Sequence, residues 1–116
     1  MTVGQVALWE ENESVEQIEL GMTGVQIPVI GFGTAGLQSG VEPIRKAVSM
    51  GANLIDTAES YGTEEVVGEA IQGIRHQVFV ATKVSAEHFR HDDVLKAVDG
   101  SLQRIGIDRI DLYQLH

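Results

Sequence analysis

The sequence contains no cysteine and only two prolines among its 116 residues. The absence of cysteine excludes a disulfide scaffold and any zinc or iron–sulfur centre held by thiolates. No apolar run approaches the roughly 18 residues that cross a bilayer, and we expect no secretory signal because the N-terminus lacks its basic and apolar segments. Basic residues are also few, with 8 Lys and Arg against 17 Asp and Glu and a formal net charge of −9.

This charge balance excludes several classes of partner. A strongly acidic protein repels phosphate at long range, which argues against nonspecific binding to nucleic acid or to an anionic membrane. Hydrophobic residues make up 43% and charged residues 22% of the chain, a composition typical of globular proteins. The length suffices for one domain with its own hydrophobic core. Together these features favour a cytoplasmic protein.

Acidic residues concentrate at the beginning of the chain, where residues 1–26 contain five glutamates and no lysine or arginine. Because the periodicity is weak up to about Glu16, we interpret residues 1–16 as an acidic N-terminal extension and residues 17–116 as the domain.

From Gln17 onward the pattern becomes regular. We expect a β-hairpin over residues 17–29, followed by strands that alternate with helices. The expected strands cover residues 29–32, 53–57, 78–82 and 110–115. The expected helices cover residues 41–50 and 64–74. A third expected helix is capped by Asp92 or Asp93 and runs to Ile105. Short loops between alternating strands and helices indicate parallel strands with right-handed crossovers.

Polar side chains occur where the predicted strands end. Asp56 ends the second strand and Tyr61 lies in the following loop, whereas Lys83 and His116 end the third and fourth strands. Each has an ordinary alternative role, such as bonding loop amides or packing. Ligands of parallel α/β sheets and barrels bind at the carboxyl ends of the strands, so the joint occurrence of these residues predicts a site.

The chemistry of these four residue types is coherent. An ammonium beside a tyrosine favours the phenolate, and a carboxylate holds that ammonium in place. A histidine can orient a carbonyl oxygen by donating a hydrogen bond. Such a set can protonate an oxygen that becomes negative as hydride reaches its carbon.

Several separated motifs resemble the aldo-keto reductase family from about Ile18 to the last residue. They occur in order with fitting spacing and comprise Gly31-Phe32-Gly33-Thr34, Gly51-Ala52-Asn53-Leu54-Ile55-Asp56-Thr57-Ala58, Tyr61-Gly62, Val80-Ala81-Thr82-Lys83-Val84, Ser101-Leu102-Gln103-Arg104-Ile105-Gly106 and Ile110-Asp111-Leu112-Tyr113-Gln114-Leu115-His116.

The resemblance implies the N-terminal half of a (β/α)8 barrel, with NADP(H) as hydride donor and an aldehyde or ketone as substrate. It implies Tyr61 as general acid, Lys83 as the residue that tunes it, Asp56 as the partner of Lys83, and His116 as the group that orients the carbonyl. It also implies Gly33, Thr34 and Asp56 as residues near the cofactor.

The chain supplies only four strands and three helices of such a barrel, which needs about 250 residues. We therefore expect no reductase activity from this chain alone. We also expect self-association through the open sheet edges. The alternative is a non-catalytic half-barrel that acts only as a structural or assembly module.

Two other hypotheses remain open at this point. The glycines from Gly31 to Gly36, with Asp56 further along, also fit a dinucleotide-binding Rossmann unit, although the apolar stripe places the next helix near Val41, later than that motif requires. His88 and His91, followed by two aspartates, are candidates for a metal site, although a polar loop leading into a helix explains them equally well.

Overall fold

The computed structural model of the chain describes residues 14–116. Most of the predicted acidic extension, residues 1–16, lies outside the described residues, so its separation from the domain stays a prediction. Within the described part, the Val15 N–H donates to the Met50 carbonyl at 3.0 Å. No helix within residues 14–116 is both long and apolar enough to cross a membrane.

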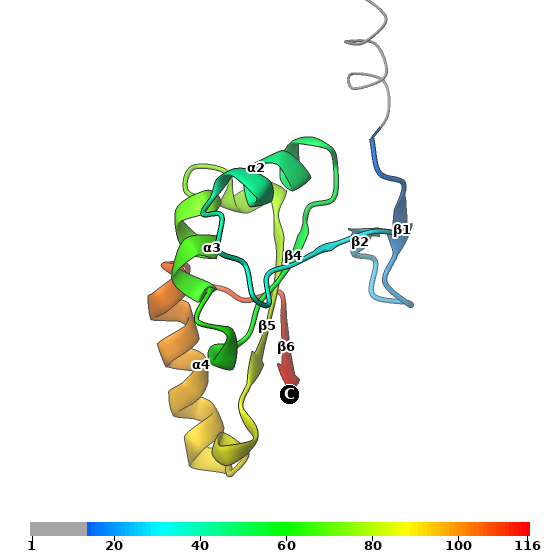
Figure 1. The fold of residues 1–116 in the computed structure, drawn as a ribbon. Helices are drawn as coiled ribbons and strands as arrows, with labels where there is room; N and C mark the ends of the chain where they lie inside the picture. The colour runs from blue at the N-terminus through cyan, green and yellow to red at the C-terminus, as the bar shows by residue number, and fades with distance from the viewer. Residues whose placement is uncertain (1–13) are drawn as a thin grey trace, which may run out of the picture.

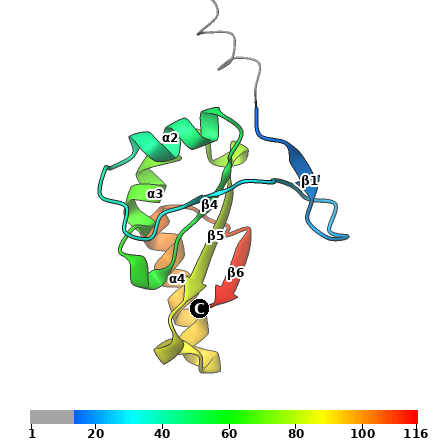
Figure 2. The same ribbon diagram turned by 45° about the vertical axis from the view of Figure 1, so that its right-hand side comes forward.

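A β-hairpin opens the described chain, as predicted. Strand β1 (Gln17–Glu19) pairs antiparallel with β2 (Gln26–Pro28), and Ile18 lies opposite Ile27. Gly21 and Gly24 in the connecting turn have positive φ angles of 55° and 77°, a conformation that glycine adopts without steric cost. The hairpin projects from the body of the molecule on the side away from the helices (Figures 1 and 2).

Four parallel strands form the central sheet. They pair in the order β3-β4-β5-β6, so each strand lies beside the next one along the chain. Their bounds are Phe32–Gly33 for β3, Leu54–Asp56 for β4, Phe79–Val84 for β5 and Leu112–Leu115 for β6. Because the strands are parallel, their carboxyl ends all lie at the same end of the sheet.

Three α-helices connect the strands and lie on the same side of the sheet (Figure 1). They are α2 (Glu42–Ser49), α3 (Glu64–Ala70) and α4 (His91–Ile105), and short 3-10 helices occupy the loops as η1 (Glu59–Tyr61), η2 (Arg75–Gln77) and η3 (Ala86–His88). Sequential strands with helices on one face are the architecture of a (β/α)8 barrel.

The observed strand order contradicts the hypothesis of a Rossmann unit. A doubly wound sheet places further strands on both sides of its first strand and helices on both faces. Here β3 is an edge of the four-stranded sheet. The first helix begins at Glu42, well after the glycine-rich motif.

Buried aliphatic side chains from the helices and inner strands form one core, whose members are Ile44, Ile55, Val67, Ala70, Ile71, Val78, Val80 and Ile105. The predicted stripe of α2 is confirmed in Ile44 and Ala47, which are both buried.

Three local predictions were wrong. Strand pairing begins only at Phe32, because Val29 and Ile30 are exposed and precede the contact with β4. Helix α3 ends at Ala70 and not at residue 74, although Ile71 in the following turn stays buried and keeps the apolar spacing. Helix α4 has Arg90 at its N-cap without a side-chain cap bond; the aspartates lie in its first turn, where the helix dipole favours a carboxylate.

Helices α3 and α4 are in close contact at Gly68. A Cβ atom added at Gly68 would lie only 2.0 Å from the carbonyl oxygen of Ile105 and 2.7 Å from its carbonyl carbon. Both obstacles are backbone atoms at the end of α4, so no side-chain rotation relieves the overlap. The absence of a side chain at Gly68 therefore permits the observed packing of the two helices.

A buried ion pair joins the same helices to β5. Glu64, 1% exposed, accepts a hydrogen bond from Arg104 Nε at 2.7 Å and another from the Thr82 hydroxyl at 2.7 Å. A buried carboxylate is tolerated only when its oxygens are paired in this way. Glu64 does lie in the first turn of α3, as predicted, but its principal partners come from α4 and β5.

Tyr113 lies beside this ion pair on β6, opposite Thr82 in the strand register. Its hydroxyl oxygen is buried and lies near Ser101 of α4. Burial raises the pKa of Tyr113 above its ordinary value of 10.0, and the nearby carboxylates of Glu59 and Glu64 raise it further. The folded protein therefore favours the neutral phenol at this position.

We predict that Gly68→Ala lowers the free energy of unfolding by about 1–3 kcal/mol, because the added methyl group forces α3 away from α4. Urea denaturation measures the loss. Gly100→Ala is the matched control, since Gly100 also lies inside a helix but its added Cβ meets only the flexible Arg104 side chain. The free energy of unfolding of Gly100→Ala should be unchanged or higher by up to about 1 kcal/mol. An equal decrease in both variants would contradict the explanation that α3 and α4 are too close at Gly68 to accept a side chain.

We predict a Tyr113-dependent loss of stability at alkaline pH. A pKa raised by folding means that the neutral phenol contributes stability below the unfolded pKa, and this contribution disappears as the pH rises through the folded pKa. Tyr113→Phe lacks the ionisable hydroxyl. The free energy of unfolding of the wild type should therefore stay parallel to that of the variant up to about pH 9 and fall relative to it as the pH rises through about 10, the ordinary pKa of tyrosine, toward the raised pKa of the folded protein. Parallel pH profiles from denaturant titrations would show that folding leaves this phenol unperturbed.

Candidate active site

The structure places the four predicted site residues together at the carboxyl ends of the parallel strands. Asp56 is the last residue of β4, Tyr61 ends the 3-10 helix η1 that follows it, and His116 directly follows β6. Lys83 lies within β5, which continues to Val84 and so extends beyond the predicted end at residue 82. The register pairs Asp56 with Ala81, which leaves Lys83 just beyond Asp56 on the neighbouring strand.

Asp56 and Lys83 form the charged centre of this cluster. Lys83 Nζ lies 2.8 Å from each carboxylate oxygen of Asp56 and donates a further bond to the Thr57 carbonyl at 3.0 Å. The Lys83 side chain is 16% exposed and that of Asp56 is 30% exposed. Three acceptors thus hold the ammonium in a partly dehydrated position, where charge-assisted bonds are stronger than in water.

Tyr61 and His116 complete the cluster. The Tyr61 hydroxyl lies 3.4 Å from Lys83 Nζ, which is also 4.9 Å from the centre of the tyrosine ring. The rings of Tyr61 and His116 meet edge to face, with centroids 5.5 Å apart and an interplanar angle of 84°. His116 Nδ1 also lies 3.5 Å from the Ser60 hydroxyl. A phenol, an ammonium, a carboxylate and an imidazole therefore lie together, as the sequence predicts.

The two other predicted residues, Gly33 and Thr34, differ from each other in exposure. Gly33 is exposed and lies beside Asp56 in the register, and a Cβ added there would meet nothing within 4 Å. Thr34 is fully buried, and both its N–H and its hydroxyl donate to the Asp56 carbonyl, at 3.0 Å and 2.9 Å. The Thr34 hydroxyl therefore faces the protein interior, and a role of this residue near a cofactor stays a prediction.

Sequence reasoning missed two threonines that support the cluster. Thr57 offers its carbonyl to Lys83, and the buried hydroxyl of Thr63 contacts the hydroxyls of Thr34 and Thr57. A signal was present, since two of these threonines directly follow Asp56 and Tyr61-Gly62. Thr63, however, reads as the N-cap of the next helix, an ordinary position for threonine.

The histidines considered for a metal site contact separate carboxylates. His88 Nδ1 lies 2.6 Å from Glu59 Oε1, and His91 Nδ1 lies 3.0 Å from its neighbour Asp92. Within residues 14–116, no three His, Asp or Glu side chains gather in an arrangement able to hold a metal ion. Glu59 also accepts the Ser85 N–H at 3.0 Å, so it links two loops near the cluster.

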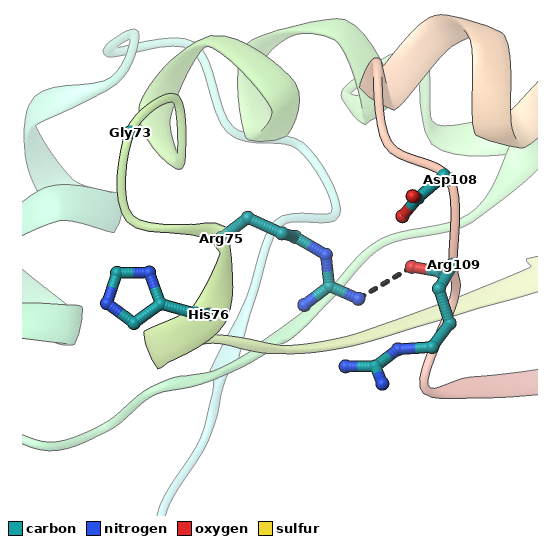
Figure 3. A pocket seen from close by; sticks show the side chains of 5 residues that line it. All are labelled: Gly73, Arg75, His76, Asp108 and Arg109. Atoms are coloured by element: carbon teal, nitrogen blue, oxygen red, sulfur yellow. Dashed lines mark hydrogen bonds between the residues drawn. The ribbon is translucent and has the colours of Figure 1, made fainter.

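A hollow of about 700 Å³ lies beside the loops that precede β5 and β6. It is lined by Gly73, Arg75, His76, Asp108 and Arg109 (Figure 3). Arg75 donates to the Arg109 carbonyl at 2.6 Å and to Asp111 at 2.9 Å. These residues precede β5 and β6, so the arginine joins two loops at the amino ends of the strands. That end of a barrel serves stability and the carboxyl end serves catalysis.

The chain is similar to known proteins in both sequence and fold. Residues 29–116 match the sequence profile of the Aldo/keto reductase family. Morphine 6-dehydrogenase from Pseudomonas putida is 42% identical over 98 residues, which cover 80% of this chain and 33% of that protein. The chain thus spans about a third of the length of this curated relative.

Solved structures of the family superpose well on the chain. A thermostable aldo-keto reductase crystallised with the inhibitor epalrestat has a TM-score of 0.81 and 39% identity, over 87% of this chain and 42% of that one. An aldo/keto reductase from Klebsiella pneumoniae, crystallised with NADP and acetate, has a TM-score of 0.75 and 36% identity, over 79% and 36% of the two chains. These likenesses confirm the predicted fold class, and the chain belongs to the aldo/keto reductase family.

Proposed function

We propose that this chain supplies the proton-delivering part of an NADP(H)-dependent reductase that converts aldehydes or ketones to alcohols. One observation carries the proposal: Lys83 Nζ is held by both oxygens of Asp56 while it lies 3.4 Å from the Tyr61 hydroxyl. This arrangement is suited to a tyrosine that gives up a proton, because the adjacent ammonium stabilises the phenolate that remains. The NADP complex of the Klebsiella relative supports the choice of cofactor.

Each residue of the cluster has a distinct task in this proposal. Tyr61 donates its hydroxyl proton to the carbonyl oxygen of the substrate as negative charge develops there. Lys83 stabilises the resulting phenolate, and Asp56 holds the ammonium in place through both carboxylate oxygens. The imidazole of His116 donates a hydrogen bond that orients the carbonyl oxygen. Solvent then returns a proton to Tyr61, which completes the proton balance.

The residues present fit the expected cofactor at the end of β3. The backbone at Gly33 is exposed and has open space where a side chain would project, and the neighbouring Asp56 carboxylate is partly exposed. A flat group can therefore approach the strand end closely, which a larger residue would prevent. NADPH, when bound, supplies the hydride that reaches the carbonyl carbon. Gly33 would line that position, and Asp56 would lie beside it.

A second candidate function is a non-catalytic assembly module. The observation that favours it is the exposure of large apolar side chains on β6, the edge strand of the described sheet: Leu115 is 67% exposed and Leu112 is 36% exposed. Exposed apolar side chains on an edge strand mark a surface that pairs with further protein. Self-association through this edge stays a prediction.

We predict that the 116-residue chain alone does not oxidise NADPH in the presence of a simple aldehyde, because the described residues form only four strands of the barrel. Joined to the C-terminal part of the thermostable relative, the same chain should bind NADPH and reduce the aldehyde. Loss of NADPH absorbance measures turnover, and fluorescence titration measures cofactor binding. Turnover by the chain alone would contradict the expectation of inactivity. A folded hybrid that binds no NADPH would favour the assembly module.

We predict that Tyr61→Phe and Lys83→Met each lower kcat of that hybrid by about 10²–10⁴-fold, the usual contribution of a positioned acid. NADPH affinity should change little, because neither side chain is assigned to holding the cofactor. The matched control is Tyr113→Phe, which removes the other tyrosine hydroxyl of the domain from the opposite face of the sheet. If Tyr61→Phe retained full kcat, Tyr61 would not be the proton donor.

A further inference from the structure

Three threonine hydroxyls form a buried chain beneath the Asp56–Lys83–Tyr61 cluster. Thr63 Oγ1 lies 2.8 Å from Thr34 Oγ1 and 2.9 Å from Thr57 Oγ1. Thr34 and Thr57 are fully buried, and Thr63 is 4% exposed. The three come from different segments: the loop after β3, the end of β4 and the start of α3. We call this set the threonine relay.

The direction of the hydrogen bonds follows from counting protons. Each hydroxyl has one proton to donate, and Thr34 gives its proton to the Asp56 carbonyl at 2.9 Å. Thr34 must therefore accept from Thr63, which uses the single proton of Thr63. Thr63 in turn must accept from Thr57. The relay thus runs in one direction, from Thr57 through Thr63 and Thr34 to the Asp56 carbonyl, with every proton in use.

Thr63 gives up its ordinary role to take part in the relay. It occupies the N-cap position of α3, where a threonine hydroxyl usually accepts a bond from a backbone N–H of the first turn. Its side chain makes no such cap bond here. Tyr61 lies two residues before Thr63, and Gly62 between them has a φ of 71°. The backbone therefore turns tightly between Tyr61 and the first residue of the relay that follows it, Thr63.

Both ends of the relay lead to groups that hold the Lys83 ammonium. Thr57 begins it, and its carbonyl accepts from Lys83 Nζ at 3.0 Å. Asp56 ends it, and its carboxylate accepts from the same ammonium at 2.8 Å. Thr63, which follows Tyr61 and Gly62, therefore contacts Thr57 directly and reaches Asp56 through Thr34. Thr57 and Asp56 are the two residues that accept hydrogen bonds from the Lys83 ammonium through a carbonyl and a carboxylate.

We propose that Thr63 is a positioning residue, whose hydroxyl fixes the Tyr61 phenol against Lys83 and Asp56. The inference deepens the proposed function of the same site and rests on it for its catalytic meaning. The contact itself is independent of cofactor and substrate. The competing explanation is that the relay only satisfies three buried hydroxyls, in which case its loss weakens the fold but leaves Tyr61 in place.

The test compares Thr63→Val with Thr63→Ser in the 116-residue chain, by NMR of protein labelled with ¹³C in its tyrosine rings. Valine keeps the shape but lacks the hydroxyl, whereas serine keeps the hydroxyl. The readouts are the ring resonances of Tyr61 and its nuclear Overhauser contact with the His116 ring. Tyr113 serves as an internal reference in the spectra of the Thr63 variants, because its hydroxyl lies near Ser101 and not near Thr63. Ser101→Ala is the control, since it alters a fully buried hydroxyl on α4 away from Tyr61.

Thr63→Val should shift the Tyr61 resonances and abolish the contact with His116, while the Tyr113 resonances keep their positions. Thr63→Ser should restore both readouts, and Ser101→Ala should leave Tyr61 unchanged even where urea denaturation shows lower stability. A folded Thr63→Val that keeps the wild-type Tyr61 spectrum would overturn the proposal. So would an equal disturbance in Thr63→Val and Ser101→Ala.

A second variant covers the case in which Thr63→Val does not fold. Thr57→Val removes only the first donor of the relay and leaves the bond from Thr63 to Thr34 and the bond from Thr34 to the Asp56 carbonyl intact. It should shift the Tyr61 resonances in part, and an unchanged Tyr61 spectrum in folded Thr57→Val would overturn the proposal. Because these readouts need neither NADPH nor a carbonyl compound, their failure is distinct from failure of the proposed reductase activity.

Discussion

The ammonium of Lys83 is the group on which the rest of the site depends. It is partly buried, and a charge removed from water costs several kcal/mol unless it is paired. The Asp56 carboxylate and the Thr57 carbonyl supply that pairing from the end of β4. Their position follows from the parallel pairing of β4 with β5, which sets Asp56 beside Ala81. Tyr61 is thus arranged around a charged pair that the sheet itself creates.

The alternation of side chains along β5 connects this pair to the helix layer. Lys83 points to the face where Tyr61 and His116 lie, whereas its neighbour Thr82 donates to the buried Glu64 of α3. A shift of one residue in register would exchange these two side chains between the faces. The buried Glu64–Thr82 bond and the Lys83–Asp56 pair therefore favour the same register from opposite sides of the sheet. Each polar system stabilises the geometry that the other requires.

The features that sequence predicted correctly are those set by local pattern. The alternation of strands and helices, the helical stripe that contains Ile44 and the convergence of polar residues at the carboxyl ends of the strands follow from short-range spacing and parallel topology. The features that it missed depend on partners far along the chain. Arg104 pairs with Glu64 across 40 positions, and the space at Gly68 is filled by the backbone of Ile105. Thr63 escaped notice because its local context, directly before a helix, already explains a threonine.

The four groups of the site are not held with equal strength. Lys83 and Asp56 lie on neighbouring strands and share two bonds of 2.8 Å. His116 follows β6, the edge strand of the described sheet, and is exposed. Its bonds within the described residues are a backbone bond to Val84 and a long side-chain contact of 3.5 Å with Ser60. The charged pair of Asp56 and Lys83 is therefore held by the inner strands β4 and β5. The imidazole of His116 is therefore the least firmly held of the four groups in the described structure, since a single contact of 3.5 Å is its side-chain hydrogen bond there.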